Sequence, residues 1–587
     1  MANAAAPTPD ESELIAFLNS VDQEVRAWGR DTKFEDRSGT WEKLRSGEFW
    51  RGTREDAEPI FNANLLGNYI ERKVAQLTES KPDISVTGRA PDLQGPSEIL
   101  LRGARAVLDE NQFDARIERA ADIGATYGFV GFNTAWDPYA DYNHGEIVVR
   151  VIHPKHLGVD YRITDTTELH KATYVYLDTP MPLADIRRIW PGRGALVIPD
   201  HRLSQYDAPG RTATSFWGGI TRSLTLTNKI DSPYPYSIVR EYWLRSDELD
   251  PESGELRYPA GRVIHRAGDT ILDDMPNPYW DGGWPIDVWD WRVDVNSFAG
   301  RSDVEALRKL QEAYGRMGNA MVKNALLHAV ISIIADHNAM LPEEWKKLDD
   351  RAARIIRKKP GSTFTIEGPP DIPSAYFMLL DQMPTLMETI VGVPKASQGS
   401  RQAGVIASSA VEGLQVAAET LVRSCARRLE YVIQRMGQKL VSRIIQFYSS
   451  DRMLSYVGAD STWQQFVFER AKLIDDSVDE DTKRTYFTNF KFRVTPLSSL
   501  PMNKTQRALM AMELFKAGLV TGVEVLKQAE YPNYEAVHAA AQKEGAEKAQ
   551  AQEQMLLKAA TLGIKMPGGG GGGRVKSNRS GTKLGFG

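Results

Sequence analysis

The longest regular pattern in the chain is a run of apolar residues spaced three or four apart between Ser408 and Tyr448. This spacing places the apolar side chains on one face of an α-helix. The residues of that face are Leu414, Ala418, Leu421, Cys425, Leu429, Val432, Met436, Leu440 and Ile444. At a rise of about 1.5 Å per residue, the pattern predicts a helix roughly 60 Å long. A helix of this length usually braces several smaller units, so we expect a multidomain chain built around it.

Two shorter helical patterns precede the long one and enclose a compact insert. Apolar residues recur at helical spacing over Asp303–Asn324 and again over Ile372–Val391. Asp303 near the start of the first helix suits the positive end of the helix dipole. Between the two helices, Val330–Ile334 and Thr363–Ile366 have strand character. A loop rich in glycine, residues 393–407, then leads to the long helix.

The part before residue 300 mixes helices and strands. The predicted helices are Phe61–Leu77, Glu98–Asn111 and Phe113–Tyr127, with Gly128 as a C-terminal stop. The predicted strands are Ile84–Val86, Phe129–Trp136, Glu146–Ile152, Ala172–Leu177, Ser237–Trp243 and Arg262–Ala267. The turn-rich residues 137–145 between the second and third strands predict a hairpin. Helices and strands in this order favour the α+β class.

The residues after the long helix add two strands and then only helices. The strands are expected at Trp463–Phe468 and Phe490–Val494. The helices are expected at Asn503–Ala517, Thr521–Ala529 and Tyr534–Ala560. The polyglycine stretch and polar residues that follow, 563–587, are typical of a flexible tail.

Composition excludes several classes of protein. The hydrophobic share of 42% and the charged share of 25% are those of an ordinary globular chain. The formal net charge of −5 argues against a protein that grips DNA phosphates tightly. The one cysteine, Cys425, excludes an intramolecular disulfide and favours assembly inside a cell. Because Cys425 lies in an apolar stripe, we expect a small buried hydrophobe rather than a nucleophile. The most apolar window, Ala325–Ala335, is too short to span a bilayer, so we expect no membrane segment.

Patterns that carry catalysis or bind metal are weak in this chain. The glycine run before Arg574 lacks the Lys and Ser or Thr of a phosphate-binding loop. His153 and His156 have no third ligand nearby, which favours a surface loop over a metal site. An acidic run consists of Asp475, Asp476, Asp479, Glu480 and Asp481. It is compatible with a cation site or a fragment of a two-metal nuclease, but more typical of a solvated loop. We therefore expect no catalytic residue, no metal and no cofactor.

The order of these elements resembles that of the portal proteins of tailed bacteriophages. Asn68–Val74, followed by Lys81–Ile84, is similar to the opening helix of that family and its exit. Tyr127–Gly131 and the strands up to His153 resemble its wing hairpin. Val391–Pro394 and Ala407–Ala410 resemble the two ends of its tunnel loop. The resemblance covers about three quarters of the chain and lies in the order of elements rather than in one motif.

The resemblance implies a division of the chain into named parts. The parts are an N-terminal arm (1–57), a first wing part (58–300), a stem helix (301–324), a clip (325–371), a second stem helix (372–392), a tunnel loop (393–407), a long helix with a second wing part (408–500), a helical crown (501–562) and a Gly-rich tail (563–587). The role of the arm and of Pro180–Asn228 does not follow from the family pattern.

The resemblance also implies a function. A portal subunit forms a ring, expected to be a dodecamer, at one capsid vertex, and double-stranded DNA enters and leaves through its channel. The expected partners are further copies of the chain, the large subunit of the terminase, tail adaptor proteins and the major capsid protein. The expected place is the virion, after assembly in the host cytoplasm.

Two groups of residues are candidate contact sites on this reading. The tunnel-loop residues Lys395, Gln398, Ser400, Arg401 and Gln402 are candidates for contact with passing DNA. Their sparse positive charge suits weak backbone contact that ignores sequence. The clip residues Arg351, Arg354, Arg357, Lys358 and Lys359 are candidates for docking a negatively charged partner. For both groups an ordinary solvated surface remains an equal alternative.

Two other classes of function remain open at this point. One is another head–tail connector or adaptor protein, although adaptors are usually much shorter than 587 residues. The other is a metal-dependent nuclease or maturation factor, which rests only on the acidic run. Rings in electron micrographs would favour the portal. Magnesium-dependent nuclease activity that is lost on changing Asp479 and Asp481 would favour the enzyme.

Overall fold

The computed structural model of the protein describes most of the chain before residue 330 and part of the remainder. The described residues are 9–31, 34–47, 61–79, 82–199, 235–250, 254–329, 332–335, 360–361, 364–367, 373–392, 420–449, 451–457, 463–474, 479–494, 511–518, 520–522 and 525. The chain divides into two compact units. The first comprises Met1–Tyr456 and Gln464–Pro501, and the second Val457–Trp463 and Met502–Gly587. In the second unit, residues 511–516 are helical.

The first unit contains helices and strands in mixed order, which confirms the α+β class. Its helices are α1 (Pro9–Asp31), α2 (Phe34–Arg45), α3 (Leu65–Thr78), α4 (Gln94–Glu110), α5 (Phe113–Tyr127), α6 (Ala140–Asn143), α7 (Leu183–Ile189), α9 (Asp303–Ala329), α11 (Ser374–Val391), α13 (Thr420–Phe447) and α14 (Glu480–Thr485). Within the long pattern of 408–448, the structure confirms a helix over α13, and residues 408–419 lie outside the described part.

The strands form small antiparallel sheets. A three-stranded sheet has the order β3-β2-β9, and a five-stranded sheet has the order β4-β5-β6-β7-β8. Their strands are β2 (Phe129–Asp137), β3 (Glu146–Ile152), β4 (Leu157–Val159), β5 (Tyr174–Pro182), β6 (Tyr236–Leu244), β7 (Arg262–Ala267), β8 (Thr270–Pro276) and β9 (Ile286–Asp290). Two further pairs are β1 (Ile84–Gly88) with β14 (Phe490–Val494), and β10 (Ser332–Ala335) with β11 (Phe364–Glu367). The remaining strands are β12 (Arg452–Val457) and β13 (Trp463–Phe468).

Helix α13 holds two of these sheets together. Its apolar face is buried from Val422 to Ile445 in the main hydrophobic core. On one side it packs on β14, where Gln438 donates to the carbonyl of Phe490 (3.0 Å) and accepts from the amide of Phe492 (3.1 Å). Gly437 allows this approach, because a Cβ there would lie 2.2 Å from the ring of Phe492. On another side the helix packs on β9.

Most predicted elements before residue 300 are present at the expected places. The hairpin of β2 and β3 is confirmed, with Gly131 opposite Ile152 and Asp137 opposite Glu146. Gly128 ends α5 in the left-handed region, with φ of 93°. The sequence patterns did not predict the helices α2, α6, α7 and α14 or the strands β4, β8, β9 and β12. The omission of β9 matters most, because β9 pairs with β2 across a long stretch of chain.

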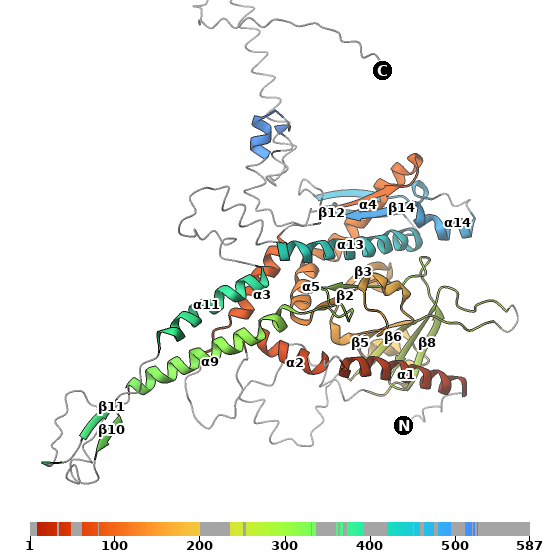
Figure 1. The fold of residues 1–587 in the computed structure, drawn as a ribbon. Helices are drawn as coiled ribbons and strands as arrows, with labels where there is room; N and C mark the ends of the chain where they lie inside the picture. Colours follow the sequence, from red (N-terminus) through yellow and green to blue (C-terminus); the bar gives the residue numbers. More distant parts are fainter. Residues whose placement is uncertain are drawn as a thin grey trace, which may run out of the picture. The chain divides into compact units, whose positions relative to one another are not determined.

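The two N-terminal helices pack on the body of the first unit. Helix α1 lies along the five-stranded sheet (Figure 1). Its Leu18 and Val21 are buried in one cluster with Tyr174 and Tyr242 of that sheet. The carboxylate of Asp22 accepts a hydrogen bond from the hydroxyl of Tyr242 at 2.9 Å. Helix α2 contributes Phe34, Trp41 and Leu44 to the main core. The first helices of the predicted arm are therefore part of the packed structure.

Candidate functional site

A row of basic and amide side chains on α13 binds the free edge of β9. Among the described strands, β9 pairs only with β2, so its other edge has carbonyl groups that need donors. Arg435 donates to the carbonyl of Val288 (3.3 Å), and Lys439 donates to that of Ile286 (2.9 Å). Lys439 also pairs with Asp287 at 2.8 Å. Burial lowers the pKa of Lys439, while Asp287 opposes that shift.

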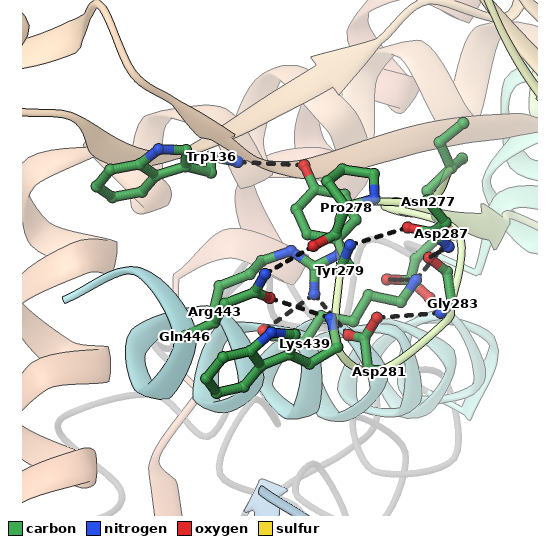
Figure 2. A network of polar contacts seen from close by, with 12 residues as sticks. Trp136, Asn277, Pro278, Tyr279, Asp281, Gly283, Asp287, Lys439, Arg443 and Gln446 are labelled. Atoms are coloured by element: carbon green, nitrogen blue, oxygen red, sulfur yellow. Dashed lines mark hydrogen bonds and ion pairs between the residues drawn. The ribbon is translucent and has the colours of Figure 1, made fainter. Parts of the chain in front are cut away.

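The same row continues to the loop before β9, which Figure 2 shows in detail. Arg443 is fully buried, donates to Asp281 Oδ2 at 2.6 Å and lies 3.9 Å from the ring centre of Tyr279. One turn later, Gln446 donates to the carbonyl of Pro278 (2.6 Å) and accepts from the amide of Trp280 (3.1 Å). Residues 278–281 of the loop therefore contact α13 one after another (Figure 2).

The other end of β9 contacts the beginning of α13. Arg428 reaches Asp290 Oδ2 (3.3 Å) and the carbonyl of Trp291 (3.1 Å). Burial raises the pKa of Asp290, and Arg428 opposes that effect. The thiol of Cys425 donates to the same carbonyl at 3.3 Å. Burial raises the pKa of Cys425, so this thiol is the buried hydrophobe expected from the sequence.

Helix α9 begins at a buried group of charges. Asp303 is fully buried, and its Oδ2 accepts from Lys73 of α3 at 2.8 Å and from Trp291 Nε1 at 2.7 Å. Its other oxygen forms an ion pair with Arg292. The ammonium of Lys73 also lies 4.9 Å from the ring centre of Trp291. A buried carboxylate needs such partners, because an unpaired charge inside a protein is strongly unfavourable.

Helices α9 and α11 run side by side from this group of charges (Figure 1). Near it, the hydroxyl of Tyr69 on α3 donates to Glu388 Oε1 of α11 at 3.3 Å. Burial, and secondarily Glu388, raises the pKa of Tyr69 to about 12. Gln311 of α9 donates to the carbonyl of Ala63 (2.8 Å) and accepts from the amide of Leu66 (3.0 Å). These contacts attach the pair of helices to α3.

The end of α11 meets the beginning of α13. Gly392 follows α11 in the left-handed region, with φ of 84°. A Cβ at this position would lie 2.8 Å from Cβ of Leu421. The end of α11 and the beginning of α13 therefore lie close together.

The first half of α11 exposes large apolar side chains. They are Tyr376, Phe377, Met378 and Leu379, and the exposed fraction reaches 65% for Met378. Leu386 in the second half is also half exposed. Pro384 lies inside the helix, where it removes one backbone hydrogen bond. A helix that is apolar on several sides normally has partners on several sides. In the described part of the chain, α11 has α9 and α3 as neighbours, and neither covers this half.

The candidate contact sites fall outside the described residues. This is the case for Lys395, Gln398, Ser400, Arg401 and Gln402 of the expected tunnel loop. It is also the case for Arg351, Arg354, Arg357, Lys358 and Lys359 of the expected clip. The structure therefore does not test either group.

The expectation of a surface loop at His153 and His156 is wrong. Both flank or end a short 3-10 helix, Pro154–His156, and both rings are partly buried. The ring of His153 lies edge-on to Tyr127, at 4.5 Å between ring centres, and its Nδ1 accepts from the amide of Lys155. Burial, followed by the nearby His156, lowers the pKa of His153 to about 3. The pattern looked like a loop because the burying residues come from α5, distant in sequence.

The acidic run is only partly described. Asp479, Glu480 and Asp481 are exposed at the beginning of α14, while Asp475 and Asp476 lie outside the described residues. Within the described ranges, no group of three or more His, Cys, Asp or Glu side chains is placed to hold a metal ion. Among the helices that the structure describes, none combines the length and apolar character that a membrane crossing requires.

The buried charges were missed by sequence reasoning, although Lys73 carried a signal. It lies on the apolar face of α3, four residues after Tyr69 and four before Leu77. A lysine at such a position requires a buried carboxylate, and the sequence alone could not say that Asp303 provides it.

The family model described as phage P22-like portal protein matches residues 46–563, which is most of the chain. No curated protein matches the sequence.

Proposed function

Because the chain belongs to the phage P22-like portal protein family, we propose that it forms the ring at one capsid vertex through which double-stranded DNA is packaged and ejected. The family has a structural role and is not a family of enzymes. Membership implies an oligomeric ring and association with the capsid. The proposal adds the channel for DNA, a ring of twelve copies and the parts of the chain that perform each task.

The exposed apolar half of α11 is the main support for the proposed contact between neighbouring copies in the ring. Phe377, Met378 and Leu379 have at least about half of their surface exposed in one copy. Full burial of such a side chain is worth about 1.5–3 kcal/mol, and because these are already half buried, a neighbouring copy that covers them adds roughly half of that for each. In a closed ring each copy uses two different surfaces, one for each neighbour. We assign the apolar half of α11 to one of these surfaces.

The described elements support an assignment of the named parts. Helices α9 and α11 lie side by side and run in opposite directions, as expected for the paired stem helices, residues 301–324 and 372–392 (Figure 1). The antiparallel pair β10 and β11, with Ser332 opposite Glu367, lies within the clip, residues 325–371. The three- and five-stranded sheets with α13 belong to the wing, 58–300 and 408–500. The helical residues of the second unit belong to the crown, 501–562.

The meeting of α11 and α13 supports the proposed tunnel loop. Gly392, which directly precedes residues 393–407, lies against Leu421 at the beginning of α13. We propose that Lys395, Gln398, Ser400, Arg401 and Gln402 contact the passing duplex without reading its sequence. Few positive charges per copy suit a channel that lets DNA slide, because affinity grows with each phosphate neutralised.

The basic residues of the clip are proposed as a docking face. Arg351, Arg354, Arg357, Lys358 and Lys359 would attract acidic surfaces on the terminase large subunit and on tail adaptors. The wing would contact the major capsid protein. The protein would assemble in the host cytoplasm and remain in the virion.

A pair of matched variants tests the proposed ring contact. Leu379→Asp places a charge in the proposed interface, where an unpaired charge is strongly unfavourable. Leu249→Asp makes the same change at an exposed leucine after β6. We expect Leu379→Asp to convert rings into monomers with unchanged circular dichroism, and Leu249→Asp to leave rings intact. Mass photometry measures the proportions of rings and monomers. Rings of undiminished abundance in Leu379→Asp would rule out this surface.

A further inference from the structure

Residues 290–292 contact four helices at the place where both stem helices meet the wing. Their side chains or carbonyls bind Lys73 of α3, Asp303 of α9, Ile390 of α11 and Arg428 of α13. Two of these helices have an end at the contact: α9 begins at Asp303, and α11 ends one residue after Ile390. The segment is therefore placed to set the relative positions of α9, α11 and α13.

Arg292 makes the link between the two stem helices. Its Nη2 forms an ion pair with Asp303, the first residue of α9. The same nitrogen donates to the carbonyl of Ile390, in the last turn of α11, at 3.0 Å. The last carbonyls of a helix have no partner within the helix and carry partial negative charge, which suits a guanidinium. One side chain thus connects the beginning of α9 to the end of α11.

The backbone around Arg292 is fixed. Its carbonyl accepts from the amide of Arg301 (2.8 Å), and the amide of Trp291 donates to the carbonyl of Gly128 (2.8 Å). Gly300 packs so closely that a Cβ there would lie 2.5 Å from the carbonyl oxygen of Arg292. Because the backbone of Arg292 is held in this way, its side chain extends towards α9 and α11 from a fixed position.

The guanidinium of Arg292 contacts α11 directly before the proposed tunnel loop. Ile390 precedes Gly392 by two residues, and Gly392 touches Leu421. Arg428 fixes the neighbouring part of α13 to Asp290 and Trp291. Residues 290–292 therefore hold both the end of α11 and the neighbouring part of α13.

We propose that Arg292 is a positioning residue: it sets the end of α11 relative to α9, and through Gly392 it sets how the ring holds DNA. The effect on DNA rests on the proposed function, whereas the effect on the helices does not. Arg292 is only partly buried, with an exposed side-chain fraction of 24%. It can therefore be changed with less disturbance than Lys73 or Asp303.

Three variants test this proposal. Arg292→Ala removes both contacts. Arg292→Lys keeps a positive charge, but its side chain is one bond shorter. An ammonium that stays beside Asp303 therefore no longer reaches the carbonyl of Ile390, although in the original protein one nitrogen of Arg292 makes both contacts. Arg452→Ala is the matched control, because Arg452 pairs with Glu146 (3.2 Å) and reaches the carbonyl of Gly145 (3.4 Å) with similar exposure.

Two readouts are needed, both on the full chain. Hydrogen exchange reports the opening of peptides from the end of α11 and the beginning of α9. We expect exchange at the end of α11 to become at least about tenfold faster in both Arg292 variants, equivalent to about 1.4 kcal/mol. At the beginning of α9, Arg292→Lys should stay close to the original protein. Arg452→Ala should change exchange only around β3.

The second readout is the dwell time of duplex DNA in single rings seated in a solid-state nanopore. We expect Arg292→Ala and Arg292→Lys to change the dwell time by the same factor, and Arg452→Ala to leave it unchanged. If Arg292→Lys behaves like the original protein in both readouts, only the positive charge of Arg292 beside Asp303 matters, and the proposal is overturned. Faster exchange with an unchanged dwell time would overturn its effect on DNA. Failure of the original protein to form rings or pass DNA would instead refute the proposed function.

Discussion

Replacing Asp303 by Asn tests whether the buried charges at the beginning of α9 hold the stem to the wing. The exposed fractions of the Lys73 and Asp303 side chains are 1% and 0%, and their charged atoms lie 2.8 Å apart. Asn has nearly the same shape but no charge, so Lys73 would remain buried without a counter-ion. Removing one partner of a buried ion pair costs about 3–5 kcal/mol, and we expect a value in this range.

Helix α9 contains its own control for this experiment. Arg308 and Glu312 form an exposed pair at 2.8 Å on the same helix. Exposed pairs of this spacing contribute about 0.3–0.5 kcal/mol, so Glu312→Gln should have a small effect. A double variant, Lys73→Met with Asp303→Asn, should cost less than the sum of the single variants, because it removes both charges together.

Hydrogen exchange in peptides of α3 and α9 is the appropriate assay. A chain of this size does not unfold in one step, so a single melting temperature would mix different events. Local exchange gives the free energy of opening for each helix separately. A cost below about 1 kcal/mol for Asp303→Asn, close to that of Glu312→Gln, would refute the reasoning that the buried pair holds these helices.

Three further predictions address other parts of the protein. Burial lowers the pKa of His153 from 6.5 to about 3, so the unfolded chain binds the proton first and stability falls as pH drops from 6.5 towards 3. Between pH 7.5 and 5, His153→Asn should lose less free energy of opening around residues 146–157, measured by hydrogen exchange, than the original protein, and equal losses would contradict this. Gly392→Ala should destabilise the end of α11 by about 1–2 kcal/mol, because alanine disfavours a φ of 84° and its Cβ would press on Leu421, and unchanged exchange there would count against it. Changing Lys395 and Arg401 together to Ala should leave rings intact and alter packaging or retention of DNA in whole particles, whereas normal particles would remove these residues from the proposed DNA contact.

Local patterns predicted many elements of this fold well. The apolar spacing of α13 and the Gly128 stop after α5 depend on residues close together in sequence. The apolar and aromatic run of β2, the alternation of β3 and the turn between them also lie within one short stretch. Such signals come from the backbone periodicity of helices and strands, so they can be read from the sequence alone.

Long-range contacts could not be predicted in the same way. Strand β9 is five residues long and is stabilised by β2 and by Lys439, which lies about 150 residues away. Asp303 suited a helix dipole in the sequence, but its main partner is Lys73, which is 230 residues away. Partners at such separations become visible only when the chain is folded. The family, by contrast, was recognisable from the order of local elements, because that order does not require knowledge of their contacts.

Electron microscopy of the purified full-length protein, combined with its mass in solution, tests the central proposal most directly. We predict closed rings with a central channel, and a mass close to twelve times the subunit mass of 65.5 kDa. A protein that stays at 65.5 kDa over a wide range of concentrations and shows no rings would contradict the proposal that this chain forms the portal channel.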